Sequence, residues 1–81
     1  MSERELLERI TYNPKIFGGR AIIRGHRLAV SHVLGMLADG ATAEEIVSAY
    51  DWLELDDVKA CLLYASHVVD SDRIEPVLAN Q

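Results

Sequence analysis

Cysteine, proline and long apolar runs are scarce in this chain of 81 residues. The single cysteine, Cys61, cannot close an internal disulfide, which excludes disulfide-stapled secreted scaffolds and favours a reducing, cytoplasmic location. The longest uncharged runs, residues 28–38 and 60–69, hold 11 and 10 residues, about half of what a membrane span requires. Charged residues at positions 3 and 4 leave no apolar segment for a signal peptide. With 49% hydrophobic residues, we expect one soluble globular domain with no membrane contact.

The sequence also lacks the motifs of common enzymes. It contains no Gly-x-Gly-x-x-Gly, phosphate-binding loop or nucleophile elbow. His26, His32 and His67 lie in separate segments, and with one cysteine they show no metal-ligand spacing. The acid pairs at 44–45 and 56–57 fall in the first turns of predicted helices, where the helix dipole favours negative charge. We therefore predict a protein that is not an enzyme and uses no metal or other cofactor.

Charge is distributed unevenly along the chain. The net charge of −5 is the sum of +3 in residues 1–30 and −8 in residues 31–81. From Arg9 to Val30 there are five basic residues and no acid. A basic first third joined to an acidic remainder indicates two kinds of contact, not one uniform nucleic-acid surface.

The basic third predicts a short helix and a β-hairpin. Ser2 and Glu5 have the spacing of a capping box, so we expect an N-terminal helix over residues 1–10. Residues 20–30 place apolar and β-branched residues on both sides of Gly25-His26, which predicts a hairpin with a type II′ turn. In this register Arg24 lies opposite Arg27, and one face of the ribbon is wholly apolar. Because a lone two-stranded ribbon is marginal in water, we expect this face to pack on helices or on another chain.

The acidic remainder predicts three helices over residues 31–39, 42–51 and 55–69. Ser31 is placed to cap the first of these helices and Gly40 to end it. Thr42 and Glu45 form a second capping box, which opens the next helix. The third helix carries a stripe with spacings of 4, 3 and 4, made of Val58, Leu62, Ala65 and Val69. Leu53 and Val58 have the spacing of a hydrophobic staple at the start of this helix. We therefore predict a mostly α single domain over residues 1–69, with helix-turn-helix proportions, and a tail over residues 70–81.

The order of these motifs resembles domain-of-unknown-function family 433 over about residues 6–69. The resemblance rests on the pair Gly18-Gly19, the stretch Arg24-Gly25-His26-Arg27 between two apolar strands, and Leu37-Ala38-Asp39-Gly40 downstream. It implies a homeodomain-like three-helix unit preceded by a hairpin, a homodimer, a VapB-like antitoxin function, and a PIN-like ribonuclease toxin as partner. Two positions depart from the family pattern, because Trp52 stands where a proline is common and Glu54 where a capping threonine is common.

The arginines of the hairpin are the strongest candidates for a binding site. Two guanidinium groups that face each other across a ribbon destabilise it unless an anion compensates them. That anion can be a phosphate, a carboxylate of a partner, or one of the protein's own acids, and the sequence leaves these alternatives open. The predicted residues for binding a partner or nucleic acid are Arg20, Arg24, His26 and Arg27.

Two further segments are candidate protein contacts. The outward face predicted for the third helix carries Lys59 and Leu63 together with two aspartates. Such a face is poorly suited to DNA, and Leu63 on it indicates a protein contact. In the tail, Ile74, Val77 and Leu78 stand at i, i+3 and i+4, the spacing of a short apolar face that could dock on a partner.

These observations favour an antitoxin-like binding protein that neutralises a ribonuclease and represses its own operon. We expect a homodimer formed through the hairpin region. The alternatives are a small dimeric DNA-binding regulator without a toxin and a non-enzymatic dimeric adaptor.

Overall fold

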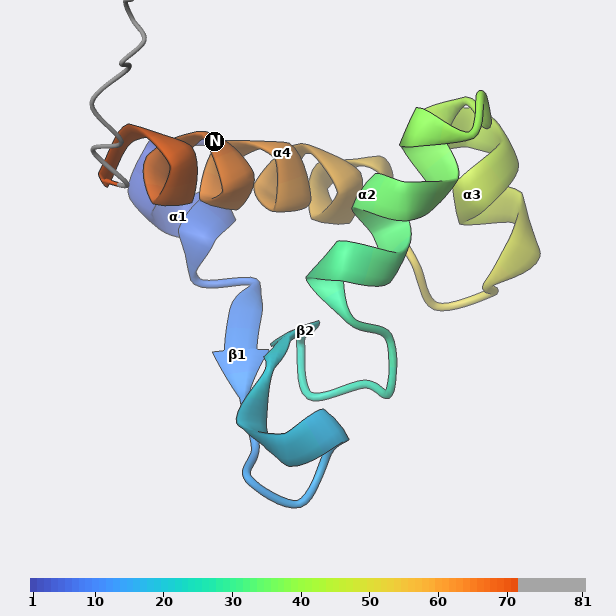
Figure 1. Ribbon diagram of the computed structural model, residues 1–81. Coiled ribbons are helices and arrows are strands. Elements are labelled where there is room, and N and C mark those ends of the chain that lie inside the picture. Colours follow the sequence, from blue (N-terminus) through green and yellow to red (C-terminus); the bar gives the residue numbers. More distant parts are fainter. Residues whose placement is uncertain (72–81) are drawn as a thin grey trace, which may run out of the picture.

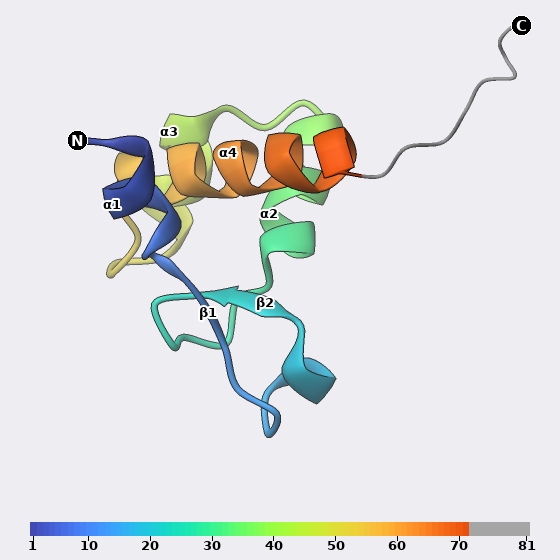
Figure 2. The same cartoon turned by 90° about the vertical axis from the view of Figure 1, so that its left-hand side faces the viewer.

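The computed structural model describes residues 1–71 and is mostly helical. Four α-helices and one two-stranded antiparallel sheet make up the regular structure of this part of the chain, with a 3₁₀ turn at Phe17–Gly19. Figure 1 and Figure 2 both show the long last helix lying across one side of the molecule, with the sheet projecting beneath it. The predicted mostly α class is confirmed. The predicted tail segment with Ile74, Val77 and Leu78 lies outside the described residues.

The first helix, α1 (Glu3–Leu7), begins as predicted and ends early. The Ser2 hydroxyl accepts from the Glu5 N–H at 3.1 Å, and the Glu5 carboxylate accepts from the Ser2 N–H at 2.9 Å, which completes the capping box. The prediction of a helix to residue 10 is wrong, because the chain turns into strand β1 (Ile10–Tyr12).

The two following helices have nearly the predicted bounds. Helix α2 (Val30–Ala38) ends in a Schellman motif, in which the Gly40 N–H donates to Leu37 O and the Ala41 N–H to Met36 O, both at 3.0 Å. Gly40 has φ of +104°, a conformation that only glycine adopts readily. Helix α3 (Ala43–Ala49) begins with the predicted Thr42 capping box. Ser31 is not a cap, because α2 begins one residue before it with extended Ala29 at the N-cap.

The sheet differs from the predicted hairpin. Strand β2 (Ala21–Ile23) pairs with β1, in the register Ile10–Ile23, Thr11–Ile22 and Tyr12–Ala21. On its other side β2 keeps one bridge of the predicted ribbon, between Ile22 and Ala29. Residues 24–29 therefore form the connection from β2 to α2, and the main pairing joins segments on either side of the 3₁₀ turn.

The turn after β2 lies one residue earlier than predicted. The His26 N–H donates to Ile23 O at 2.8 Å, so Arg24 and Gly25 are the central residues. Both have positive φ, at +46° and +75°, which is the signature of a type I′ turn and not of type II′. As a result Arg24 does not face Arg27 across a ladder.

The core lies between the sheet, α2, α3 and the first half of α4 (Leu55–Ser71). The apolar face predicted for the ribbon is used here, because Ile23, Leu28 and Val30 are buried in the chain's own core. The stripe predicted for the last helix is buried only at its first residue. Val58 is buried, but Leu62 and Val69 are 51% and 73% exposed. The helix instead buries Asp57, Val58, Ala60 and Cys61.

Among the helices of the described residues, none has both the length and the apolar character that crossing a membrane requires.

Candidate functional site

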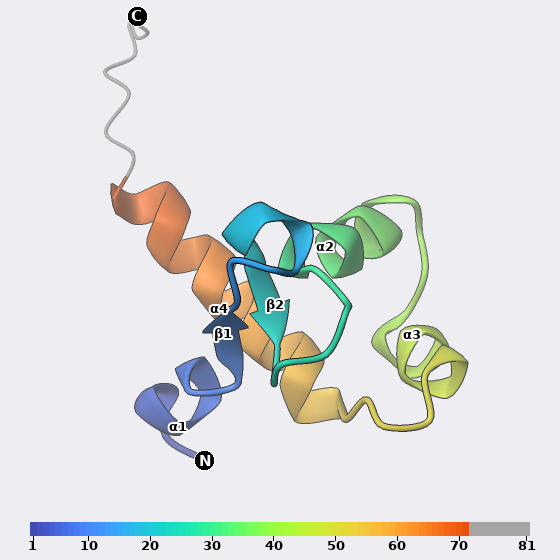
Figure 3. The same cartoon turned by 90° about the horizontal axis from the view of Figure 1, so that it is seen from below.

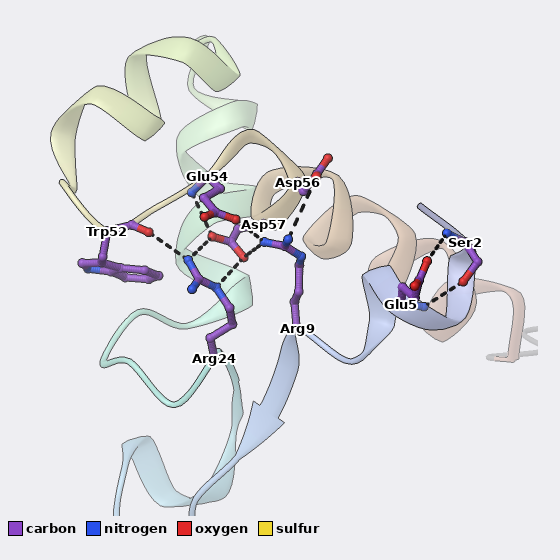
Figure 4. Close-up of polar contacts among 8 residues, drawn as sticks. All are labelled: Ser2, Glu5, Arg9, Arg24, Trp52, Glu54, Asp56 and Asp57. Carbon is purple, nitrogen blue, oxygen red and sulfur yellow. Dashed lines mark hydrogen bonds and ion pairs between the residues drawn. The ribbon is translucent and has the colours of Figure 1, made fainter.

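Asp57 is a fully buried carboxylate in the first turn of α4, and it gathers donors from three segments. Its side chain has 0% exposure. Arg24 donates to both oxygens in a fork, from Nε at 2.9 Å and from Nη2 at 2.7 Å. Arg9 donates from Nη1 at 2.9 Å, and the Glu54 N–H donates at 2.8 Å (Figure 4). Because Arg9 precedes β1 and Arg24 follows β2, this arrangement ties both strands, at one end of the sheet, to the start of α4.

The same contacts explain how α4 begins although Glu54, the residue before it, is a poor cap. Glu54 is the residue before the helix, and its side chain points to Arg9 Nη1 at 2.7 Å instead of capping the helix. The Asp57 side chain accepts from the Glu54 N–H, which supplies one half of a capping box. Leu53 and Val58, both buried, flank this turn as the predicted hydrophobic staple.

The electrostatics of Asp57 favour its charged form. Burial on its own raises the pKa of a carboxyl, but the hydrogen bonds from Arg24, the Glu54 N–H and Arg9 outweigh it and hold the pKa of Asp57 below its usual value. Hydrogen bonding to Glu54 and Asp57 raises the pKa of Arg9, and hydrogen bonding to Asp57 raises the pKa of Arg24. All three groups stay ionised at neutral pH, so the cluster is a permanent ion-pair network.

Two of the four predicted binding residues are thereby held within the fold. Arg24 also donates from Nη2 to the Trp52 carbonyl at 2.8 Å, and its guanidinium carbon lies 5.6 Å from the centre of the Trp52 ring. The His26 ring stacks on Trp52, with ring centroids 3.7 Å apart and an interplanar angle of 3°. Of the alternatives that the sequence left open for Arg24, the structure shows pairing with the protein's own acid.

The other two predicted residues, Arg20 and Arg27, lie together on an open groove. Both side chains are exposed, and within residues 1–71 neither makes a hydrogen bond or ion pair. The groove has a volume of about 850 Å³ and is lined by the 3₁₀ turn, the loop after β2 and one side of α2 along its length. Its other lining residues include Phe17, His32, Asp39 and Tyr50. This surface, which we call the arginine groove, presents two free guanidinium groups beside aromatic rings and a single acid.

Phe17 is the residue of this groove that sequence reasoning missed. It is 48% exposed and has φ of +50°, an uncommon conformation for a residue with a side chain. It precedes Gly18 and Gly19, which also have positive φ. Those two glycines were the available signal, because they mark a tight turn that projects its neighbours into solvent.

The apolar residues exposed on α4 differ from the one that the sequence predicted. Leu63, predicted as an outward contact, is half-buried. The exposed apolar residues of the helix are instead Leu55, Leu62, Val68 and Val69.

No cluster in the described residues has the composition of a metal site. Cys61 has 0% exposure, and burial raises the pKa of its thiol to about 12. Such a thiol is protonated at neutral pH and unreactive, as expected for a small core residue.

Comparison with known proteins identifies a protein family for this chain. No curated protein and no solved structure matched the chain. A family model described as a protein of unknown function, DUF433, matches residues 10–65, a segment that contains β1, the arginine groove, and Arg24 and Asp57 of the buried ion-pair network. Because the match extends over more than half of the sequence, the chain belongs to the DUF433 family.

Proposed function

We propose that the protein is a cytoplasmic, antitoxin-like binding module that captures and neutralises a PIN-like ribonuclease toxin through the arginine groove. The observation that carries the proposal is the pair of unpartnered guanidinium groups, Arg20 and Arg27, on one open groove. The resemblance to VapB-like antitoxins, stated above on the sequence motifs, is the reason for choosing a ribonuclease as the partner.

The chemistry of a guanidinium suits this task. Its planar fork binds a carboxylate through two hydrogen bonds, and it stays charged at any physiological pH. A metal-dependent ribonuclease keeps a cluster of acids at its active site, and an arginine placed there replaces the charge of the metal. Arg20 and Arg27 are free for this role, while Arg9 and Arg24 are engaged by Asp57.

Repression of the protein's own operon is the second part of the proposal. The presence of three consecutive helices, α2, α3 and α4, supports our proposal of a homeodomain-like helix-turn-helix unit. The exposed face of α4 is a poor reader of DNA, because Lys59 is accompanied there by Asp56 and Asp70. We therefore assign phosphate contacts to the exposed basic residues Lys15, Arg20 and Arg27 of the first third of the chain.

The test is co-expression with the product of the neighbouring gene, followed by pull-down and a ribonuclease assay. Arg20→Gln and Arg27→Gln, singly and together, should weaken capture and restore ribonuclease activity without changing the melting temperature. Arg4→Gln is the matched control, because Arg4 is an exposed arginine on α1, away from the groove. Equal effects of all three substitutions, or capture unchanged in the double variant, would contradict the proposal.

A DNA-binding regulator without a toxin predicts a different outcome. In that case no protein is captured by the unchanged chain or by the groove variants, and the groove variants retain less DNA. Each lost phosphate contact also reduces the slope of log affinity against log salt by about one unit. Salt-sensitive retention on operator DNA, with no protein captured from the neighbouring gene, would favour this alternative.

A further inference from the structure

Three exposed apolar residues of α4 lie in a single line along the helix. Leu55, Leu62 and Val69 are spaced seven residues apart and are 49%, 51% and 73% exposed. Ala65, on the same side, is half-buried. A seven-residue repeat of apolar positions is the spacing by which one helix packs along another. We call these four residues the α4 seam.

The seam borders an apolar groove between α4 and α2. The groove has a volume of about 340 Å³, and its apolar lining includes Val30, Leu34, Ala65, Val68 and Val69. Val68 is 49% exposed although it continues the side of the helix that is buried at Cys61. Figure 3 shows why, since the C-terminal half of α4 extends past α2 and α3. The core face of the helix thus runs on into a region where the described chain does not cover it.

The charges at the two ends of the seam indicate what covers it. Residues 60–69 contain no Asp, Glu, Lys or Arg, and this neutral stretch is bracketed by Lys59 and Asp70. If two copies of α4 pack antiparallel, Leu62 of one copy meets Ala65 of the other, and Lys59 lies within about 3 Å along the axis of the other copy's Asp70. A parallel pair would place lysine level with lysine and aspartate level with aspartate. The surface is therefore complementary to itself about a two-fold axis.

From this pattern we infer that the protein forms a homodimer through antiparallel packing of the α4 seam, with Lys59 of each copy paired to Asp70 of the other. The hairpin region is less suited to this contact, because Ile23, Leu28 and Val30 are buried inside the chain. Arg20 lines the groove beside the seam, but neither Arg20 nor Arg27 belongs to the seam itself, so the inference rests on other contacts than the proposed function does.

The oligomeric state tests the inference directly. Sedimentation equilibrium of the full chain should give twice the 9.0 kDa chain mass. Leu62→Lys should weaken dimerisation by about 30-fold or more, the effect of losing a central interface residue. Ala49→Lys is the matched control, because it adds the same charge at an exposed apolar position on α3. Far-UV circular dichroism and melting of the diluted monomers show that the variants remain folded.

A charge exchange tests the antiparallel orientation. Lys59→Glu should weaken the dimer by placing a glutamate beside Asp70 of the other copy, and adding Asp70→Lys in the same chain should restore it. A 9.0 kDa particle at every concentration, or a Leu62→Lys variant that dimerises like the Ala49→Lys control, would overturn the seam. Failure of the double charge variant to recover would overturn the antiparallel pairing.

Discussion

Replacing Asp57 with asparagine should destabilise the protein more than any other single change of charge. Asn keeps the shape of the side chain but removes its charge and turns one acceptor into a donor. In the folded protein that position receives four hydrogen bonds, three of them from the guanidinium groups of Arg9 and Arg24. After the substitution, two cations face each other without the carboxylate that holds them together.

The size of the effect follows from the burial of the three groups. Removing one partner of a buried ion pair costs about 3–5 kcal/mol. The Arg9 and Arg24 side chains are 17% and 33% exposed, so water solvates part of the released charge and the lower end, about 3 kcal/mol, is expected. A domain of this size has a total stability of about 4–12 kcal/mol. The melting temperature should therefore fall by about 12–24 °C.

Urea and thermal unfolding followed by far-UV circular dichroism measure the loss. Glu54→Gln is the matched control, because Glu54 also pairs with Arg9, at 2.7 Å, but its side chain is 58% exposed. An exposed pair contributes about 0.2–1 kcal/mol, so the control should change stability little. If Asp57→Asn costs no more than Glu54→Gln, the network does not hold the sheet against α4 and the reasoning above is wrong.

Three further outcomes follow from the same structure. The pKa of Asp57 in the folded protein lies below its unfolded value of about 4. The stability that ionised Asp57 gives to the fold is therefore complete above about pH 4 and is lost as the pH falls through the folded pKa. In the Asp57→Asn variant, the free energy of unfolding should depend less on pH in this acidic range. Gly40→Ala should destabilise by about 1 kcal/mol or more, because φ is +104°, whereas Gly35→Ala, within α2, should stabilise by about 0.5–1 kcal/mol in urea unfolding. Cys61 should resist thiol reagents at pH 8 in the folded protein and react after denaturation, since it is 0% exposed with a pKa of about 12.

The helices were the most predictable part of the fold, because their signals are local. The capping boxes at Ser2 and Thr42 and the glycine at position 40 act within a few residues of themselves, and each has the predicted geometry. The helix starting at residue 55 was predicted at its first residue, although Glu54 is a poor cap, because Leu53 and Val58 supplied a second local signal.

The sheet was less predictable because its pairing is not local. Strand β1 has three residues and is stable only through β2, which lies beyond a turn and a 3₁₀ segment. Ile10, Thr11 and Tyr12 are all good strand residues, and this was the available signal. The predicted hairpin instead paired residues 21–24 with the apolar segment that follows them most closely, residues 27–30. Of that pairing the structure keeps the bridge between Ile22 and Ala29.

The apolar stripe of α4 shows how periodicity can be right about spacing and wrong about the partner. The residues at 58, 62, 65 and 69 do share one side of the helix, but the chain's own core covers only the first of them fully. A pattern of apolar residues predicts that one side of a helix is buried, but it does not predict whether its own chain or another chain covers that side. The proposed dimer assigns the remaining positions to a second copy.

The basic residues that the sequence placed in one group fall into two groups in the structure, one paired with Asp57 and one unpaired within residues 1–71. Sequence reasoning treated Arg20, Arg24 and Arg27 as one cluster, because nothing local distinguishes them. The structure separates them through Asp57, whose position in the first turn of α4 had been explained by the helix dipole alone. One buried acid thus converts Arg9 and Arg24 into structural residues. Arg20 and Arg27 keep their full charge for a ligand, so binding should depend on these two residues, and folding on the other two.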